Sequence, residues 1–414
     1  MNKNKKTWNR SKKIILRGNS LFSKNPENFS KDWPAYFDKA KGCEIWSIDK
    51  KKYIDFSYMG IGTNILGYSN SKIDNHVKKI ISKGTMSTLN CVEEVSLSQQ
   101  LIKMHPWSSM CKFTRTGAEA SAVAIRIGRI YSKKNKIAIC GYHGWHDWYL
   151  SVNLKGKKKL DTHLFKNLNI DGVDKNLKNS SVAFKHNDLD SFKNMIRKNK
   201  DIGVVIMEVE RFNEDDKNFL KYIRDYTKKY KIALIFDECT SGFRQTFGGL
   251  HLKYKINPDI CILGKALGNG YPINAVVGTK QIMHQAQKSF ISSTFWSDRI
   301  GPAAALKTLE IMKKERSWVK LKKLGIYFKK NFKLILKKYS VSGDIIGTGS
   351  LLQFKIDKLD DSFLKKFFAS NMLRRGILAS NVIYLSTAHS EILLKKYLSA
   401  IDATIDKLKR MKKI

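Results

Sequence analysis

The first residue that could do chemistry is a lysine in an unusual setting. Lys265 lies in the stretch ILGKALGNGYP (262–272), between apolar residues and glycines, whereas most lysines of this chain lie among other charges. An apolar setting lowers the pKa of a lysine by desolvation, and a neutral amine can attack an aldehyde to form a Schiff base. The alternative is an ordinary loop lysine whose amine reaches water.

A carboxylate follows a second apolar run. Asp237 comes directly after IALIF (232–236), and a carboxylate at the end of a buried strand is costly unless it is paired. A pyridinium nitrogen would be a suitable partner, because the aspartate keeps the nitrogen protonated and the ring then acts as an electron sink. The alternatives are a helix N-cap or a structural salt bridge, and we interpret the neighbouring Glu238 as structural.

A candidate phosphate site precedes a helix. The stretch TRTGAEASAVAIRIGR (114–129) places Thr116, Gly117 and Ala118 immediately before a run of helical character. The free N–H groups at a helix start bind phosphate, and glycine allows close approach. Many helices start with Thr or Gly, so this pattern gains meaning only beside the other candidates.

Aromatic residues and histidines follow a further strand-like run. The stretch GYHGWHDWY (141–149) puts Tyr142 and His143 between glycines, where an aromatic ring could stack on a planar cofactor. His143 and His146 lie three residues apart, but no third metal ligand accompanies them. We therefore expect no metal site.

Alternating elements would bring these residues to one edge of a sheet. Apolar strand-like runs such as KIAIC, IALIFDE and ICILG alternate with amphipathic helical runs. Strands that are apolar throughout and separated by helices predict an α/β fold with a mainly parallel sheet covered on both faces. In such sheets chemistry gathers at the carboxyl ends of the strands, which is where the following residues fall: Tyr142, His143, Glu208, Asp237 and Lys265.

The remaining patterns predict the domain organisation. Residues 1–41 form a polar, partly irregular N-terminal arm, and 42–70 contain a β-hairpin, since GCEIWSIDKKKYIDF alternates apolar and polar residues around a charged turn. A large domain follows over 71–305, opened by two amphipathic helices up to about residue 104. The pattern over residues 306–414 predicts a smaller α/β domain, and we expect the hairpin to belong to it.

The chain is strongly basic. It has 77 Lys plus Arg residues against 36 Asp plus Glu, a formal net charge of +41. Such a balance suggests binding to nucleic acid or to an anionic membrane, but the lysines are spread over the whole chain, with no helix-turn-helix spacing, zinc-finger cysteines or Gly-aromatic RNA-binding signature. We interpret the charge as a lysine-rich surface that could attract anionic substrates, rather than as a nucleic-acid site.

The cysteine pattern favours a reducing compartment. The six cysteines include no C-x-x-C pair, and they are Cys43, Cys91, Cys111, Cys140, Cys239 and Cys261. This pattern predicts free thiols rather than metal ligands or disulfides. No run approaches the ~20 apolar residues of a membrane span, and no apolar signal-peptide core follows the basic N-terminus. We expect a cytoplasmic protein that does not bind membranes.

Together these segments resemble the class III aminotransferases, a fold type I group that depends on pyridoxal phosphate (PLP) and includes glutamate-1-semialdehyde aminomutase. The resemblance rests on FTRTGAEASAVAIRIGR, GYHGWHDW, ALIFDECTSGFR, PDICILGKALGNGYPINAVVG and STFWSDRIGPAAALKTLE, with further similarity in the hairpin region and in STAHSEI. It extends from about residue 42 to the end, and the Asp-Glu pair followed 28 residues later by Gly-Lys is highly specific. It implies a PLP-binding large domain with a mainly parallel seven-stranded sheet, and a smaller α/β domain.

The resemblance implies roles around the cofactor ring. Lys265 would bind PLP and shuttle protons, and Asp237 would hold the pyridine nitrogen. Tyr142 would stack on the ring beside His143. Glu208 would lie near the substrate side of the cofactor.

The resemblance also implies a phosphate site and a partner. Thr116, Gly117 and Ala118 would bind the phosphate at the helix start. Thr294 matches a threonine that reaches the phosphate from a second subunit. We therefore expect a homodimer with shared active sites.

Departures from the aminomutase pattern favour a different substrate. After Glu208 the chain continues with VERFNEDD instead of Pro and a small-residue loop, SLFSKNPENFS replaces Gly-Gly-Val-Asn-Ser, and TFWSDRIGP replaces Thr-Leu-Ser-Gly-Asn-Pro. TFWSDRIGPAAAL with YHGWHDWYL resembles transaminases associated with surface-glycan or secondary-metabolite pathways. Arg115, Arg244 and Arg299 are candidates for binding a substrate carboxylate or phosphate, the alternative for each being an ordinary ion pair.

The leading hypothesis is a PLP-dependent aminotransferase that moves an amino group from an amino-acid donor to an aldehyde or keto acceptor. The second is an intramolecular aminomutase of the glutamate-1-semialdehyde type, which uses the same cofactor and needs no separate donor. The third is a catalytically inactive, basic binding protein, against which the intact Lys265, Asp237 and Tyr142 argue.

Overall fold

One of the two structural units of this protein is formed by both ends of the chain. The computed structural model describes residues 2–156, 158–210 and 216–414; positions 211–215, within the stretch VERFNEDD, lie outside this description. The units are Met1–Asn75 with Met312–Ile414, and His76–Ile311. The chain passes between them within α3 (Ser71–Ile81) and α11 (Ile300–Glu315).

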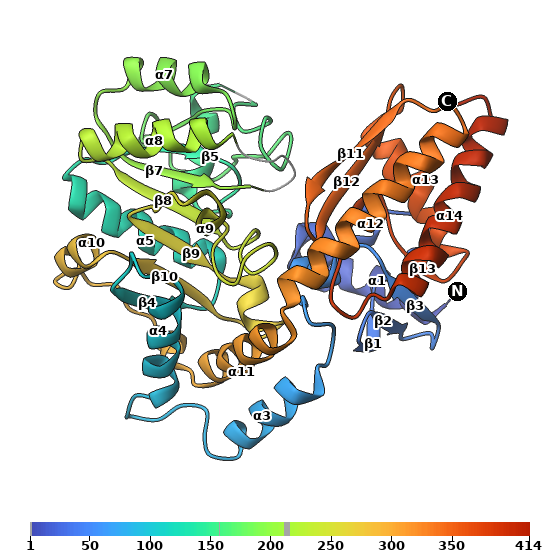
Figure 1. The fold of residues 1–414 in the computed structure, drawn as a ribbon, viewed down its shortest axis with the longest axis horizontal. Coiled ribbons are helices and arrows are strands. Elements are labelled where there is room, and N and C mark those ends of the chain that lie inside the picture. The colour runs from blue at the N-terminus through green and yellow to red at the C-terminus, as the bar shows by residue number, and fades with distance from the viewer. Residues whose placement is uncertain (1, 157, 211–215) are drawn as a thin grey trace. The chain divides into compact units, whose positions relative to one another are not determined.

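A seven-stranded sheet forms the centre of the unit His76–Ile311 (Figure 1). Its order is β4-β10-β9-β8-β7-β5-β6. Strands β6, β5, β7, β8 and β9 pair in parallel, whereas β10 is antiparallel to both β9 and β4, so the expected α/β fold with a mainly parallel sheet is confirmed. The strands are β4 Met110–Thr114, β5 Lys136–Cys140, β6 Ser181–Ala183, β7 Ile202–Glu208, β8 Ala233–Glu238, β9 Ile260–Leu263 and β10 Asn274–Gly278.

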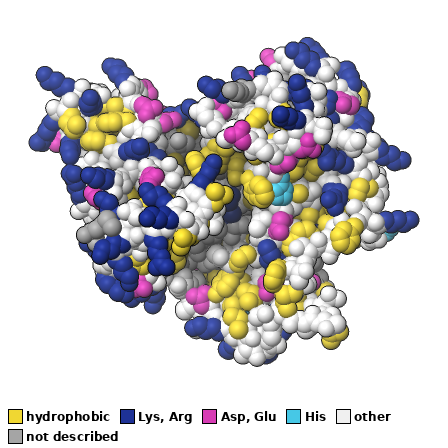
Figure 2. Space-filling view, turned by 180° about the vertical axis from the view of Figure 1, so that it is seen from behind, with side chains coloured by type: hydrophobic (Ala, Val, Ile, Leu, Met, Phe, Trp, Pro, Cys, Tyr) yellow, Lys and Arg dark blue, Asp and Glu magenta, His cyan; other side chains and the backbone are white. Residues whose placement is uncertain are grey.

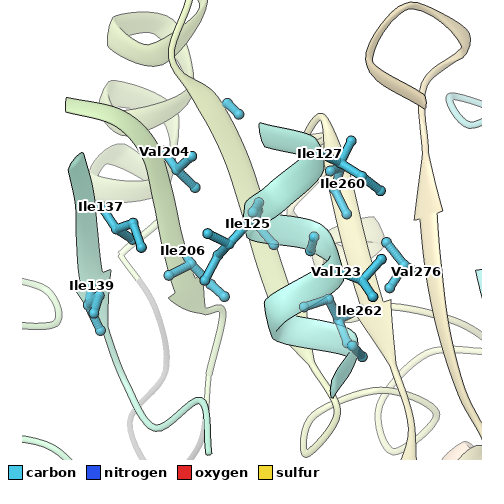
Figure 3. Packing of buried hydrophobic residues seen from close by; sticks show 14 of the residues in the cluster. Val123, Ile125, Ile127, Ile137, Ile139, Val204, Ile206, Ile260, Ile262 and Val276 are labelled. Atoms are coloured by element: carbon cyan, nitrogen blue, oxygen red, sulfur yellow. The ribbon is translucent and has the colours of Figure 1, made fainter. Parts of the chain in front are cut away.

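Buried apolar side chains cover both faces of this sheet, because successive residues of a strand point to opposite faces. On one face α5 (Gly117–Ser132) packs on the strands (Figure 3), through residues that include Val123, Ile125, Ile127, Ile206 and Ile262. The other face packs against α7 (Leu189–Lys198) and α8 (Lys217–Lys229). Burial of both faces explains why the central strands are continuous apolar runs.

Helix α5 begins at the residues that the sequence marks as its start. Thr116 Oγ1 accepts a hydrogen bond from the Glu119 N–H at 3.3 Å, and Glu119 Oε2 accepts from the Thr116 N–H at 2.9 Å. This reciprocal capping box fixes the direction in which the chain enters the helix. Further helices of this unit are α4 Val92–Met104, α6 Asp147–Leu150, α9 His251–Tyr254 and α10 Lys280–Gln285, with short 3₁₀ turns η4 Ser151–Lys155, η5 Lys175–Leu177, η6 Lys265–Gly268 and η7 Thr294–Ser297.

Two small sheets lie in the unit formed by the chain ends. The predicted hairpin is confirmed as β2 (Glu44–Ser47) antiparallel to β3 (Lys52–Asp55), within a sheet of order β1-β2-β3-β13. In the second sheet, β11-β12-β14, all pairs are antiparallel, and α12, α13 and α14 lie alongside it (Figure 1). Their bounds are β1 Phe37–Lys41, β11 Gly343–Thr348, β12 Leu351–Ile356, β13 Ile377–Leu378, β14 Val382–Tyr384, α12 Ser317–Lys338, α13 Asp361–Leu373 and α14 Glu391–Arg410.

The N-terminal arm contains a helix that its local sequence does not predict. At the start of α1 (Lys3–Ile14), Asp49 Oδ1 accepts from the Lys3 N–H at 2.8 Å and Asp49 Oδ2 accepts from the Asn4 side-chain amide at 2.6 Å. A carboxylate at a helix start is favourable because it faces the positive end of the helix dipole. The sequence predicts a partly irregular arm here. The helix has a local N-cap, since Asn2 Oδ1 accepts from the Lys5 N–H at 2.9 Å, and the Asp49 carboxylate, 46 residues away, adds a contact that local sequence does not reveal.

A left-handed turn follows the hairpin. All four residues of α2 (Met59–Gly62) have positive φ: 41° at Met59, 67° at Gly60, 61° at Ile61 and 76° at Gly62. This region is strained for a β-branched residue such as Ile61. The buried Asp55 carboxylate fixes the approach to the turn by accepting from the Ser57 N–H at 2.7 Å and from the Tyr68 hydroxyl at 2.6 Å. Tertiary contacts therefore hold the turn against the local preference of its residues.

The surface is basic without one dominant cluster. Figure 2 shows Lys and Arg side chains distributed over the visible face rather than gathered in a single patch. Among the described residues, no helix combines the length and the apolar character that crossing a membrane requires. All six cysteines are free thiols, and four of them are buried, namely Cys43, Cys140, Cys239 and Cys261.

Candidate active site

Two carboxylates end neighbouring strands on the α5 side of the sheet. Glu208, the last residue of β7, pairs in register with Asp237 of β8, which in turn pairs with Ile262 of β9. Register partners in parallel strands point to the same face, and Ile262 packs in the cluster formed with α5. Asp237 therefore faces the side of the sheet that α5 covers, and Lys265 follows the end of β9 after a single residue.

Asp237 is held by a histidine. Its Oδ2 lies 2.8 Å from His143 Nδ1, and its Oδ1 accepts from the Cys239 N–H at 3.1 Å. His143 Nε2 lies 3.1 Å from the Cys140 carbonyl oxygen. Both atoms that face the imidazole are therefore hydrogen-bond acceptors. Burial alone would raise the pKa of Asp237, but the hydrogen bond and charge of His143 outweigh burial and hold that pKa below 3.8.

The Lys265 amine is fixed from two directions. Its Nζ donates to Thr240 Oγ1 at 2.7 Å, and its backbone adopts a left-handed conformation with φ of 44°. The preceding Gly264 has no room for a side chain, since a Cβ there would lie 1.9 Å from Asn274 Oδ1. The end of β9 is thus pressed against Asn274, and this contact directs Lys265 toward the loop that carries Thr240.

The start of α5 offers N–H groups to an anion. The capping box engages the N–H groups of Thr116 and Glu119, whereas those of Gly117 and Ala118 lie in the first turn, where a helix has no internal acceptors. Gly144 packs against this turn, because a Cβ on it would lie 2.7 Å from Ala118 Cβ. Helix start and β5 loop therefore form one close-packed cradle that suits a phosphate group.

The Tyr142 ring is oriented by its neighbours. The backbone N–H of Tyr142 donates to Glu208 Oε2 at 3.0 Å, and this bond ties the loop after β5 to the end of β7. The rings of Tyr149 and Phe165 meet the Tyr142 ring edge-on, with centroids 5.8 and 5.1 Å away. Glu208 thus supports the backbone of the residue whose ring the sequence predicts to stack on the cofactor.

Arg115 and Arg299 are engaged within their own chain. The Arg115 guanidinium donates to the carbonyl oxygens of Trp296 at 3.0 Å and Asp298 at 2.6 Å. Arg299 forms a two-pronged pair with Glu93, at 2.9 and 2.8 Å. Arg115 Nε also lies 3.5 Å from the Asp298 carboxylate, and a role of either arginine in binding a substrate stays a prediction. These contacts hold the segment that carries the exposed Thr294.

Arg244 is almost completely buried, with 2% of its surface exposed. Its Nε donates to the Thr240 carbonyl oxygen at 2.6 Å. A buried guanidinium at this place holds the loop after β8. This contact lies on the backbone of the residue whose hydroxyl receives the Lys265 amine.

Glu238, the neighbour of Asp237, points to the opposite face and into a closed network. Its carboxylate accepts from the N–H groups of Leu250 and His251, from His251 Nδ1 at 2.5 Å and from the Ser241 hydroxyl at 3.2 Å. Burial would raise the pKa of Glu238, but the hydrogen bonds from the His251 side chain and from the N–H groups of His251 and Leu250 hold that pKa below its ordinary value. The expected structural role of Glu238 fits these contacts.

Glu238, His251 and Cys261 lie close enough together to suggest a metal site. However, the Trp107 indole N–H donates to His251 Nε2 at 2.9 Å, so that nitrogen carries a lone pair. The proton of the neutral ring then sits on Nδ1, the atom that faces Glu238. A protonated nitrogen cannot ligate a metal, and the cluster is a hydrogen-bonded network instead.

Two functional contacts are absent from the sequence interpretation. Thr240 accepts a hydrogen bond from the Lys265 amine. In the sequence, the only indication of this contact is a hydroxyl residue three positions after Asp237. Asn274 accepts from the Cys239 thiol at 3.3 Å and donates to the Arg115 carbonyl oxygen at 3.1 Å, which links the sheet to the phosphate cradle. Its signal was a polar residue at the start of the apolar run NAVVG.

Comparison with known proteins decides the family. The profile for aminotransferase class-III matches residues 27–406. The chain belongs to the class-III aminotransferases. It is 35% identical over 314 residues to 3-aminobutyryl-CoA aminotransferase of Cloacimonas acidaminovorans (strain Evry), covering 73% of this chain and 72% of that protein.

Two further proteins cover nearly the whole class-III chain. Glutamate-1-semialdehyde 2,1-aminomutase of Nitrosopumilus maritimus (strain SCM1) is 31% identical over 433 residues, covering 98% of this chain and 99% of that protein. The PLP internal aldimine form of the FumI protein of Sphingopyxis sp. MTA144 has the same fold, with a TM-score of 0.86 at 21% identity, over 98% of this chain and 96% of that one.

The cofactor of this class-III enzyme is PLP, and the residues present fit it. An anionic carboxylate, Asp237, suits a protonated ring nitrogen. The N–H groups of Gly117 and Ala118 suit a phosphate, and Lys265 supplies an amine for an aldehyde. These groups converge on the α5 side of the sheet.

Proposed function

We propose that this enzyme is an intermolecular aminotransferase that moves an amino group from an amino-acid donor to an aldehyde or keto acceptor. The observation that carries the proposal is the placement of Asp237 near the end of β8 and of Lys265 just after the adjacent strand β9, with the start of α5 on the same side. An amine, an ionised carboxylate and a phosphate cradle in this order are what amino-group transfer on PLP requires.

Each of these residues has a defined task. When bound, PLP supplies an electron sink that stabilises negative charge at the substrate carbon bearing the amino group. Asp237, kept ionised by His143, holds the ring nitrogen in its protonated form. Lys265 Nζ takes the proton from that carbon and returns it on the product side. Tyr142 orients the ring from one face.

The phosphate would be held at the helix start. Gly117 and Ala118 donate their N–H groups to it, and Thr116 is positioned to add its hydroxyl. Glu208 keeps the Tyr142 loop in place through the 3.0 Å contact with the Tyr142 N–H. The acceptor belongs to a class that we propose from sequence similarity alone, namely an aldehyde or ketone of glycan or secondary-metabolite biosynthesis.

A second copy of this chain would complete the site. Thr294 is exposed, and exposed apolar residues flank its segment and the neighbouring one, namely Leu89, Val92, Phe290 and Phe295. The Arg299–Glu93 ion pair joins these two segments. Apolar groups of this size in water favour a protein partner, and we propose a homodimer in which Thr294 reaches the phosphate of the other subunit. Light scattering at several concentrations tests the dimer.

An intramolecular aminomutase is the second candidate. It is favoured by the similarity to glutamate-1-semialdehyde 2,1-aminomutase over nearly the whole chain. The same Lys265 and Asp237 would serve it. The two candidates differ in whether a separate donor is consumed.

A donor scan tests the proposal. The reconstituted enzyme is mixed with single amino acids and with 3-aminobutyryl-CoA, the compound in the name of one relative, and loss of the visible cofactor band is recorded. Bleaching by a donor, followed by recovery of the band with a keto or aldehyde acceptor, is expected. Turnover of glutamate-1-semialdehyde without any added donor would support the aminomutase instead.

A further inference from the structure

The Lys265 amine contacts a buried hydroxyl group. Nζ donates to Thr240 Oγ1 at 2.7 Å, and Thr240 is 3% exposed. The two residues reach each other from different strand ends, since Thr240 follows β8 and Lys265 follows β9. The contact is therefore a product of the fold and not of neighbouring positions in sequence.

We propose that Thr240 is a positioning residue that holds Lys265 Nζ whenever this amine is not bonded to the cofactor. The inference rests on the proposed function, because it concerns the lysine that moves protons in amino-group transfer. It adds a residue that acts through Lys265 rather than on the substrate. In this view the hydroxyl defines the place from which the amine attacks and to which it returns.

The loop makes Thr240 a stiff support. The β-branched side chain of a threonine has few accessible rotamers. The Thr240 carbonyl oxygen accepts from Arg244 Nε at 2.6 Å, and Arg244 itself is 2% exposed. A lysine side chain has four rotatable bonds and loses much conformational freedom when its end is fixed. A fixed hydroxyl thus pre-organises an amine that would otherwise sample many positions.

A hydroxyl suits both protonation states of the amine. It accepts a hydrogen bond from an ammonium group and can donate one to a neutral amine. A carboxylate in this place would instead stabilise the ammonium form and hinder loss of the proton. The Thr240 hydroxyl can therefore hold Nζ in either protonation state, as a group that takes and returns a proton needs.

Substitutions at Thr240 test the proposal with a readout other than turnover. Cofactor-free protein is mixed with PLP, and the rate of capture is followed by absorbance; capture forms a C=N bond between Nζ and the aldehyde carbon and releases the aldehyde oxygen as water. Thr240→Val keeps the shape and removes the hydroxyl, so capture should slow about 10-fold. Thr240→Ser should capture at a rate close to that of the parent protein.

The neighbouring residue provides a matched control. Ser241 also carries a buried hydroxyl, but it donates to Glu238 on the opposite face. Ser241→Ala should lower the unfolding midpoint in urea while leaving the rate of PLP capture unchanged. In steady-state assays, Thr240→Val should lower kcat about 10-fold with the donor KM within about twofold.

Two results would overturn the proposal. One is capture and turnover by Thr240→Val at the rate of the parent protein, and the other is equal impairment of Thr240→Val and Thr240→Ser. If Thr240→Val does not fold, Thr240→Ala serves in its place. If no donor or acceptor supports turnover in the parent protein, the proposed function fails, but the capture rates still decide the role of Thr240.

Discussion

Asp237 and Glu238 are neighbours on one strand, and their side chains face opposite sides of the sheet. Asp237 faces α5, where the described chain gives its carboxylate hydrogen bonds from His143 and from the Cys239 N–H. Glu238 faces the other side, where donors from Ser241, Leu250 and His251 surround it. Both carboxylates are buried and both keep a lowered pKa.

The two carboxylates differ in their hydrogen-bond partners and in the groups that lie next to them. The donors around Glu238 engage both of its carboxylate oxygens, and the network extends to Trp107, which donates to His251, and to His105, whose ring stacks on that of His251. Asp237 instead contacts a single histidine side chain, His143, and lies at the sheet edge where the start of α5 and Lys265 converge. Burial with a lowered pKa therefore does not identify a catalytic carboxylate by itself. In the proposed mechanism, the face of the sheet to which each side chain points separates the catalytic carboxylate from the structural one.

The largest expected effect is on the Asp237 side. Replacing Lys265 with Ala removes the amine that binds the cofactor and moves the proton, so transamination should fall roughly 10⁴-fold or more. The stability of the cofactor-free protein should stay close to that of the parent. Single-turnover assays with the best donor measure the loss. Lys280→Ala, an exposed lysine at the start of α10, is the control and should retain full activity.

Asp237→Asn should cost activity more than stability. An amide cannot keep the ring nitrogen protonated, and loss of one such electrostatic group lowers kcat roughly 10²–10³-fold. Steady-state kinetics with saturating PLP, together with urea unfolding of the cofactor-free protein, measure both quantities. A variant with near-parent kcat would remove Asp237 from the mechanism.

Glu238→Gln should show the reverse pattern. The new amide would meet the N–H groups of Leu250 and His251 with one acceptor too few, and unsatisfied buried donors should lower the free energy of unfolding by about 3 kcal/mol. Under conditions where the variant is folded, kcat should stay within about threefold of the parent. Equal stability losses in Glu238→Gln and Asp237→Asn would break the comparison.

The smallest expected effect is a pH dependence of the free energy of unfolding, which arises at His105 beside the Glu238 network. Burial lowers the pKa of His105 from 6.5 to about 4, so the folded state binds fewer protons than the unfolded state between these values. The free energy of unfolding should therefore fall as the pH drops from about 6.5 to about 4, and this contribution should be flat above 6.5. Urea unfolding at pH 7.0, 5.5 and 4.5, as test conditions at ~25 °C, measures it.

A His105 variant isolates this contribution. His105 Nδ1 donates to the Leu101 carbonyl oxygen at 2.9 Å, and its Nε2 accepts from the Gly249 N–H at 2.9 Å. His105→Gln should be less stable at neutral pH because one of these bonds is weakened. Its further loss of stability on acidification should be shallower than that of the parent, and an unchanged slope would count against the assignment.

The strand ends were predictable because they follow from composition and order. Apolar runs separated by helices predict the sheet, and the polar residues that interrupt those runs, such as Asp237 and Lys265, predict the edge where chemistry occurs. The helix start at Thr116 was equally readable, since its capping pattern is local. The family resemblance added the roles of these residues to what the pattern supplied.

Long-range contacts were not predictable from local pattern. Helix α1 gains a contact with Asp49, 46 residues away, and the left-handed turn at Met59–Gly62 depends on packing that outweighs the preference of Ile61. The pairing of Asp237 with His143 joins residues 94 positions apart. The hydroxyl of Thr240 gains meaning only when β8 and β9 lie side by side. Tertiary structure decides such contacts, whereas sequence periodicity reports the elements alone.

The most direct test of this account locates the lysine that holds PLP. The reconstituted protein is reduced with borohydride, digested, and searched by mass spectrometry for the peptide that carries the reduced cofactor. The account predicts modification at Lys265, the lysine that follows β9 and lies on Thr240. Modification of any other lysine of this basic chain, with Lys265 unmodified, would contradict it.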